Sequence, residues 1–347
     1  MTPIAGHWGY GLDTICSAQQ TDTRRCRCAG AGMLVSVEDC IANLRCPVSK
    51  RPLEKIGDRL LSVPANGDAR REYRIIDGRP VLVDFETSVL EESTVETTAA
   101  ASEVERANYS GMSQLIKKML SPDKDGTRKH IEKLREQLAT SEGKSRVLVI
   151  GGGSIGQGMQ PLYDDPQTQI YSFDIYATPN VQFVADAHAI PIEDGFFDAV
   201  VIQAVLEHVL EPEKVVGEIW RVLRPGGTVY ADTPFMQQVH EGAYDFTRFT
   251  ESGHRYLFRR FDLIESGSNG GPGLQLMWSA DYFVRSLFRS RIAGKIAKLA
   301  FAWAQLLDRF IPENYSVDGA SGVYFLGRKM DRTISPQEII EHYQGAQ

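Results

Sequence analysis

The sequence predicts an α/β protein with a doubly wound, seven-stranded, mostly parallel sheet and a small β-rich N-terminal module. Seven apolar runs of strand length recur between residues 141 and 330, and segments with helical spacing fit between them. The runs are 146–150, 170–174, 181–185, 197–203, 228–233, 261–266 and 323–326. Strands that alternate with helices imply parallel pairing, with helices on both faces of the sheet.

Composition excludes several classes of protein. The chain has 347 residues, of which 42% are hydrophobic, so it can bury a full core and global disorder is excluded. Its net charge of −7 disfavours nucleic-acid binding by bulk charge. No stretch approaches the roughly 20 apolar residues that span a bilayer, and residues 1–20 lack the apolar region of a secretory signal. The five cysteines all lie in the first 46 residues, unlike a disulfide scaffold, so we expect a reducing cytoplasm.

Composition and pattern divide the chain into five segments. They are a loose tail (1–40), a small β-rich module (41–85), a linker with helices (86–140), the main domain (141–330, with a helical insertion at 282–311) and a C-terminal helix and tail (331–347). Asp77 and Gly78 lie between two apolar runs and predict a tight hairpin, because both residues suit positive φ. Six glutamates in 86–107 predict a solvated linker.

A glycine-rich loop follows the first strand of the main domain. Gly151, Gly153 and Gly156 satisfy the G-x-G-x-x-G pattern directly after the run 146–150. Glycines let the backbone turn sharply and approach a ligand closely, and the next helix offers unpaired N–H groups there. The pattern alone also describes dinucleotide folds, so it predicts a nucleotide-like ligand without naming it.

Two aspartates follow the next two strands. Asp174 ends the second strand, 18 residues beyond Gly156, where a carboxylate can accept hydrogen bonds from both hydroxyls of a ribose. Asp186 follows the third strand and can accept from an adenine amino group, while the Ala187 amide serves a ring nitrogen. These residues therefore predict a nucleoside ligand at the strand tips.

The run from 146 to 235 resembles the core of class I S-adenosylmethionine-dependent methyltransferases. The resemblance is carried by Leu-Glu-His-Val at 206–209 and Arg-Val-Leu-Arg-Pro-Gly-Gly at 221–227, in the expected order behind the glycine loop. It implies a Rossmann-like fold and S-adenosyl-L-methionine as cofactor. Family members commonly have an acid where this chain has Val149, so backbone groups or Gln203 would hold the methionine end.

The acceptor is expected beyond the fourth and fifth strands, because ligands of open α/β sheets lie at the carboxyl ends of strands. A hydroxyl or amine acceptor must lose a proton, and a histidine is a natural base near neutral pH. His240 is the first candidate and His208 the second, Asp245 would orient a histidine, and Arg248 would hold an anionic acceptor. The 240–250 pattern also resembles bacterial methyltransferases linked to surface-sugar or lipid pathways, which implies a small-molecule or lipid-linked acceptor.

The segment around Cys46 resembles the small zinc-ribbon-like activator subunit of tRNA and translation-factor methyltransferases. The marks are Cys46-Pro47 and the run from Tyr73 to Leu82. Ser49 stands where zinc-bearing members have a second cysteine, and no cysteine follows position 46, so a Cys₄ site cannot form and no metal is expected. The implied role is a stabilising or substrate-presenting module.

Residues 282–311 place apolar side chains three to five positions apart and carry a local charge of +5. A helical cap packed on the domain is one interpretation, and peripheral membrane contact is another. Two rival functions also remain open: an NAD-dependent oxidoreductase, and a non-catalytic S-adenosylmethionine-binding protein. The sequence leaves the acceptor and the oligomeric state open.

Overall fold

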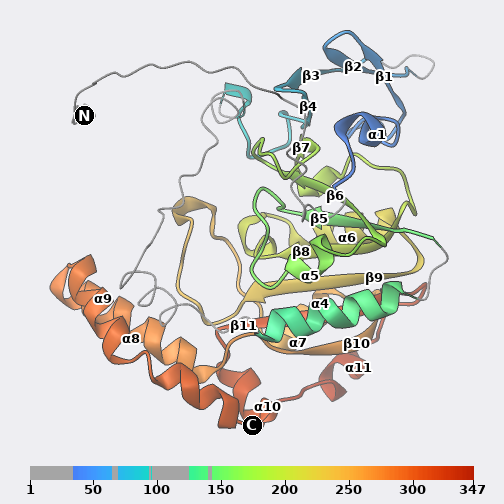
Figure 1. Cartoon of the computed structure of the whole chain (residues 1–347). Coiled ribbons are helices and arrows are strands. Elements are labelled where there is room, and N and C mark those ends of the chain that lie inside the picture. Colours follow the sequence, from blue (N-terminus) through green and yellow to red (C-terminus); the bar gives the residue numbers. More distant parts are fainter. Residues whose placement is uncertain (1–33, 65–68, 94, 96–124, 140–142) are drawn as a thin grey trace, which may run out of the picture. The chain divides into compact units, whose positions relative to one another are not determined.

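The computed structural model describes residues 34–64, 69–93, 95, 125–139 and 143–347. Within these residues the strands join in one sheet, in the order β1-β2-β3-β4-β7-β6-β5-β8-β9-β11-β10 (Figure 1). The strands are β1 Leu53–Ile56, β2 Arg59–Ser62, β3 Glu72–Ile76, β4 Arg79–Leu82, β5 Ser145–Ile150, β6 Thr168–Asp174, β7 Phe183–Ala185, β8 Phe197–Gln203, β9 Leu223–Pro234, β10 Phe261–Ser268 and β11 Gly322–Lys329. The predicted tail residues 1–33 and the predicted helical residues 109–124 lie outside the described part.

The centre of the sheet is parallel and is wound in both directions from β5. This strand pairs in parallel with β6 on one side and with β8 on the other, and β8 pairs in parallel with β9. Antiparallel β11 lies between β9 and β10. The strand order therefore reverses beside β5, and ligands of such sheets bind beyond the carboxyl ends of the strands at this point.

Helices cover both faces of the sheet, as predicted. Alternate residues of a strand face opposite sides. Leu148 and Ile150 pack in a core with α6 (Pro212–Val222) and α7 (Glu251–Leu257). Val147 and Val149 pack in a second core with α4 (Asp125–Leu138). The expected α/β class is confirmed.

The other helical elements are shorter, apart from those of the insertion. They are α1 Val37–Ile41, α5 Gln160–Tyr163, α10 Glu313–Ser316 and α11 Pro336–Glu341, with 3-10 helices η1 Ala187–Ala189, η2 Leu206–His208, η3 Gly242–Tyr244 and η5 Val317–Gly319. Two of them, η1 and η2, follow strands directly, so they position residues at the sheet edge where a ligand is expected.

All seven predicted strands of the main domain are present, but the sheet is larger than the predicted seven strands. β4 pairs in parallel with β7 through Val81–Val184 and Leu82–Ala185, so the four N-terminal strands extend the main sheet. β9 also begins at Leu223 rather than at the predicted residue 228, because Leu223 already pairs with Phe197 of β8, and the Arg-Pro-Gly-Gly residues 224–227 form an irregularity before Thr228 pairs with Ala199.

The predicted Asp-Gly hairpin is confirmed. Asp77 and Gly78 have φ values of 48° and 74°, and Ile76 pairs with Arg79 across the two-residue turn. Near it, the Cys46 Sγ lies 3.1 Å from the hydroxyl of Tyr73 and accepts a hydrogen bond from the Ser49 amide. The resemblance to the activator subunit and the five domain boundaries stay predictions.

The helical insertion begins earlier than predicted, at Pro272. It comprises α8 (Pro272–Phe288), α9 (Arg291–Ala300) and the 3-10 helix η4 (Ala304–Phe310), and α8 and α9 lie side by side (Figure 1). Asp308 of η4 accepts hydrogen bonds from the amides of Gly273 and Leu274, so it caps the start of α8. None of the described helices combines the length and the apolar content needed to cross a bilayer.

Candidate active site

The glycine loop turns directly off β5 and closes against β6. Gly151 has φ 75°, a conformation that residues with a side chain rarely adopt. A Cβ at Gly153 would lie 2.6 Å from Asp174 Oδ2, so the loop passes β6 more closely than a larger residue allows. The helix that follows, α5, has only four residues and begins at Gln160, beyond the glycine loop. Backbone amides of the loop itself are therefore the groups available to a ligand.

Asp174 lies beside this loop at the end of β6. Its carboxylate accepts hydrogen bonds from the amides of Gly153 (2.8 Å) and Ile175 (2.7 Å). Burial raises the pKa of Asp174, against the amide donors, which lower it. The fold thus brings Gly153 and Asp174 together, and the predicted ribose-binding role of Asp174 stays a prediction.

Asp186 follows β7 and caps the short helix η1, in which Ala187 is buried. Its Oδ1 accepts from the His188 amide at 2.9 Å and lies 2.6 Å from His188 Nδ1, and Ser88 donates to Oδ2. Burial alone would raise the pKa of Asp186, but these donors outweigh it and lower the pKa. Asp186 is therefore an ionised acceptor at the sheet edge, and its predicted contact with adenine is untested.

Gln203 ends β8 and faces Asp232 of β9 in register. Gln203 Nε2 donates to Asp232 Oδ2 at 3.3 Å, while its Oε1 is buried without a hydrogen-bond partner and stands against Gly156. Asp232 is 8% exposed and also accepts from Asn269. Sequence analysis missed Asp232, although an acid that ends a strand beside Gln203 was a usable signal.

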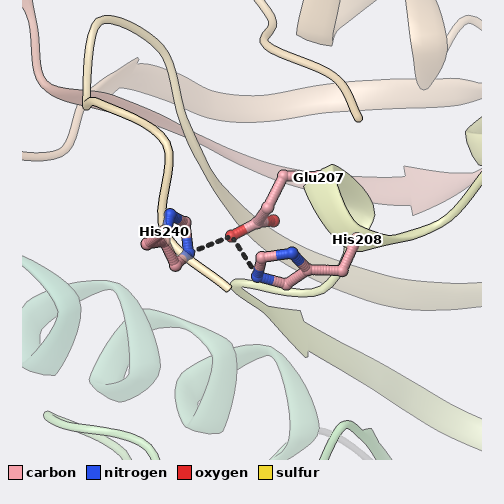
Figure 2. Close-up of side chains that lie close together, drawn as sticks. All are labelled: Glu207, His208 and His240. Atoms are coloured by element: carbon pink, nitrogen blue, oxygen red, sulfur yellow. Dashed lines mark ion pairs between the residues drawn. The ribbon is translucent and has the colours of Figure 1, made fainter. Parts of the chain in front are cut away.

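Three side chains converge beyond β8 and β9: Glu207, His208 and His240 (Figure 2). Glu207 lies on η2, is fully buried, and has no hydrogen-bond partner at either oxygen. His208 Nε2 and His240 Nε2 each lie 3.6 Å from Glu207 Oε1, and the centroids of the two imidazole rings are 4.7 Å apart. The structure thus brings the two predicted histidines together, with a carboxylate that the prediction did not assign.

The far side of each imidazole ring has its own acceptor. His208 Nδ1 lies 2.7 Å from the carbonyl oxygen of Tyr244, and His240 Nδ1 lies 3.3 Å from Asp245 Oδ2. The proximity of Glu207 raises the pKa of His240. Hydrogen bonds from Arg248 lower the pKa of Asp245 to about 2, so this carboxylate is ionised. Asp245 Oδ2 also accepts a hydrogen bond of 2.8 Å from the His240 backbone amide, so Asp245 lies directly against His240, and its role in orienting the ring stays a prediction.

The contacts of Arg248 differ from the predicted contact with an anionic acceptor. Its guanidinium donates to both oxygens of Asp245 and to the carbonyls of Gln237, Gln238 and Thr247. An arginine has five N–H donors, and these contacts use all of them. Arg248 thus fixes the loop that carries His240, and it has no donor left for an anionic acceptor.

The same loop is tied to the helical insertion. Gln275 of α8 donates to the carbonyl of Met236 at 2.7 Å, and Gln238 donates to the hydroxyl of Ser279 at 3.1 Å. Any displacement of α8 is therefore transmitted to the segment next to His240.

The main domain is similar to known methyltransferases. Residues 150–231 match the family model described as a methyltransferase domain. The demethylmenaquinone methyltransferase of Renibacterium salmoninarum is 36% identical over 138 residues, which are 37% of this chain and 54% of that protein. The ubiquinone/menaquinone biosynthesis C-methyltransferase UbiE of Yersinia pestis is 38% identical over 74 residues, which are 20% of this chain and 29% of that protein. The solved phosphoethanolamine N-methyltransferase 2 of Haemonchus contortus, in complex with S-adenosyl-L-methionine, is 17% identical, with a TM-score of 0.36 over 58% of this chain and 52% of its own.

This chain thus spans about half of the length of the first of these curated relatives and less than a third of the second. The match over 150–231 to a methyltransferase domain supports the predicted methyltransferase class for this part of the sheet. Gly153, Asp174, Asp186 and Gln203 lie inside the matched residues, whereas His240 lies outside them.

Proposed function

We propose that this chain is an enzyme that transfers the methyl group of S-adenosyl-L-methionine to a hydroxyl or amine of an acceptor molecule. The contact between the Gly153 amide and Asp174, inside the matched methyltransferase domain, carries this proposal. It places a close-approaching backbone and a carboxylate at the point where the strand order reverses, as nucleoside binding requires. Asp186 and Ala187 would serve the adenine, and Gln203 the methionine end.

The reaction is an in-line displacement. The bond from the sulfonium to the methyl carbon breaks, a bond from the methyl carbon to the acceptor oxygen or nitrogen forms, the acceptor loses a proton, and S-adenosylhomocysteine leaves. The sulfonium already activates the methyl group, so the protein chiefly supplies alignment. We assign Glu207, His208 and His240 to the acceptor side, because they follow β8 and β9 at the ligand-binding edge of the sheet. Asp245 and Arg248 act behind His240 as positioning residues.

We further propose that the acceptor is lipid-linked and is met at a membrane surface. The insertion exposes large apolar side chains, among them Phe283 (69%), Ile292 (73%) and Phe310 (69%). Residues 282–311 also carry a local charge of +5. An apolar helix face flanked by basic residues is suited to an anionic bilayer surface. Two of the proteins named above are a demethylmenaquinone methyltransferase and a ubiquinone/menaquinone biosynthesis C-methyltransferase by name, which is compatible with an apolar acceptor but does not decide between oxygen and nitrogen as the methylated atom.

Ligand binding and methyl transfer test the central proposal separately. Thermal melting of the full chain should shift upward with S-adenosylhomocysteine and not with NADH, because only ligands of the native state raise its stability. Methyl-labelled cofactor should then label a component of the lipid fraction of a cell extract. A shift with NADH alone would favour an oxidoreductase, and saturable cofactor binding without a labelled product in any fraction would favour a non-catalytic binding protein.

A further inference from the structure

The cluster of Glu207, His208 and His240 has the composition and spacing of a metal-binding site. Its three ligand atoms all lie within 4.8 Å of one another, and both Nε2 atoms stand 3.6 Å from Glu207 Oε1. Around a cation bound at about 2.0–2.2 Å, neighbouring ligand atoms are separated by roughly 3.0–3.5 Å. The two distances from nitrogen to the carboxylate oxygen are close to this range, and the two imidazole nitrogens lie at most 4.8 Å apart, so small rotations of the rings would complete the site.

The contacts of the Nδ1 atoms of the two histidines also favour a metal site. The Tyr244 carbonyl can only accept a hydrogen bond, so Nδ1 of His208 carries a proton, which leaves Nε2 as the ring atom that a metal could bind. Asp245 Oδ2 lies 3.3 Å from Nδ1 of His240, so the Nε2 atom of this ring also faces Glu207. Metal-binding histidines characteristically donate their other N–H to a carbonyl or a carboxylate in this way.

Glu207 supplies an independent observation. This side chain is fully buried, and both of its oxygens lack a hydrogen-bond partner, although it faces the two Nε2 atoms (Figure 2). Burying a carboxylate is costly unless a positive charge or hydrogen-bond donors compensate it. The carboxylate oxygen and the two Nε2 atoms therefore face one point, which a cation can occupy.

We propose that Glu207, His208 and His240 together bind one divalent transition-metal cation. Two imidazoles and one carboxylate suit Zn²⁺, Fe²⁺ or Co²⁺, and three protein ligands leave room for a further ligand such as the acceptor. The role of this cation rests on the proposed function: beside the acceptor it would lower the pKa of a bound hydroxyl. His240 would then act as a ligand, and the proton of the bound hydroxyl would pass to water instead of to His240.

The test is a titration of the full chain, freed of metal by a chelator, with Co²⁺ followed by visible absorption and with Zn²⁺ followed by calorimetry. We expect one cation per chain. Glu207→Gln and His240→Gln should each weaken binding at least tenfold, because each removes one of three protein ligands. His342→Gln is the matched control: His342 is also paired with a buried carboxylate, Glu251, but no second histidine joins that pair in the described structure. It should bind the cation like the unmodified chain.

A thermal shift with S-adenosylhomocysteine accompanies every titration. Variants that keep this shift are folded, so a loss of cation binding in them is a loss of ligands. The proposal is overturned if the unmodified chain binds no cation, because ion pairs with protonated histidines would then compensate Glu207. It is equally overturned if the Glu207 and His240 variants bind as tightly as the unmodified chain. Cation binding without any cofactor shift would instead contradict the proposed function and leave the metal site standing.

Discussion

The Tyr282 hydroxyl donates a hydrogen bond of 3.0 Å to the carbonyl of Val239, the residue immediately before His240. Tyr282 lies on α8, so this bond joins the helical insertion to the acceptor side of the candidate active site. The helix that exposes apolar side chains therefore also holds the loop that carries His240.

Tyr282→Phe removes this bond and should loosen the loop. One hydrogen bond contributes about 0.5–1.5 kcal/mol, so we expect methyl transfer to slow roughly two- to tenfold. Cofactor affinity should not change, because Asp174, the proposed ribose ligand, lies at the end of β6 and not on the loop that Tyr282 holds. Tyr343→Phe is the control, since that hydroxyl is bonded to Asp318 instead. Equal rates for the two variants would show that the tether is irrelevant to turnover.

Asp174→Ala should weaken cofactor binding at least tenfold, measured by calorimetry with S-adenosylhomocysteine. A charge-assisted contact of a carboxylate is worth roughly 1.5–3 kcal/mol. Asp198→Asn serves as the control, because Asp198 lies near the opposite end of a strand and binds Arg146 and Arg224. If Asp174→Ala leaves the affinity unchanged, the ribose assignment is wrong.

His240→Ala should slow methyl transfer by about 10²–10⁴-fold, the range measured for residues that activate an acceptor. The expectation holds whether His240 removes a proton or binds a cation. S-adenosylhomocysteine affinity should stay the same, since His240 lies outside the glycine loop and the strand tips that would hold the nucleoside. An unaffected rate would remove His240 from the reaction.

Ile292→Glu combined with Ile296→Glu should abolish most binding to anionic vesicles in a sedimentation assay. Both side chains are largely exposed on α9, so the changes should not disturb the core, and each loses an apolar contact with lipid worth about 1.5–3 kcal/mol. Ile340→Glu on α11 is the matched control, with 78% of its surface exposed outside the insertion. Undiminished vesicle binding by the double variant would contradict the membrane proposal.

His254 should make the fold sensitive to acid. Burial among aromatic rings lowers its pKa from 6.5 to about 3. Between these values the unfolded chain binds more protons than the folded chain, so the free energy of unfolding falls as the pH drops below 6.5. From pH 7 to pH 5 this amounts to about 2 kcal/mol. Urea unfolding at pH 7 and at pH 5 gives the free energy of unfolding at each pH. His254→Phe should reduce the difference between these two free energies by about 2 kcal/mol. If the variant shows the same difference as the unmodified chain, the assignment to His254 is wrong.

The strands were predictable because buried parallel strands are apolar along their whole length, so β5, β6 and β8 stand out in the sequence. Gly151 and Asp174 were predictable for a related reason, since their positions relative to strand ends follow from the chain alone. The parallel pairing of β4 with β7 was not predictable, because it joins residues about a hundred positions apart across segments without a regular pattern.

By itself, the sequence predicted the class of domain and singled out the two histidines, His208 and His240, that meet beyond β8 and β9. The tertiary structure alone decided that Glu207 is buried between His208 and His240, and that Arg248 is fully used by Asp245 and backbone carbonyls. The physical reason is that strand and turn signals are local, whereas the partners of a polar side chain depend on loops that meet only after the sheet has formed.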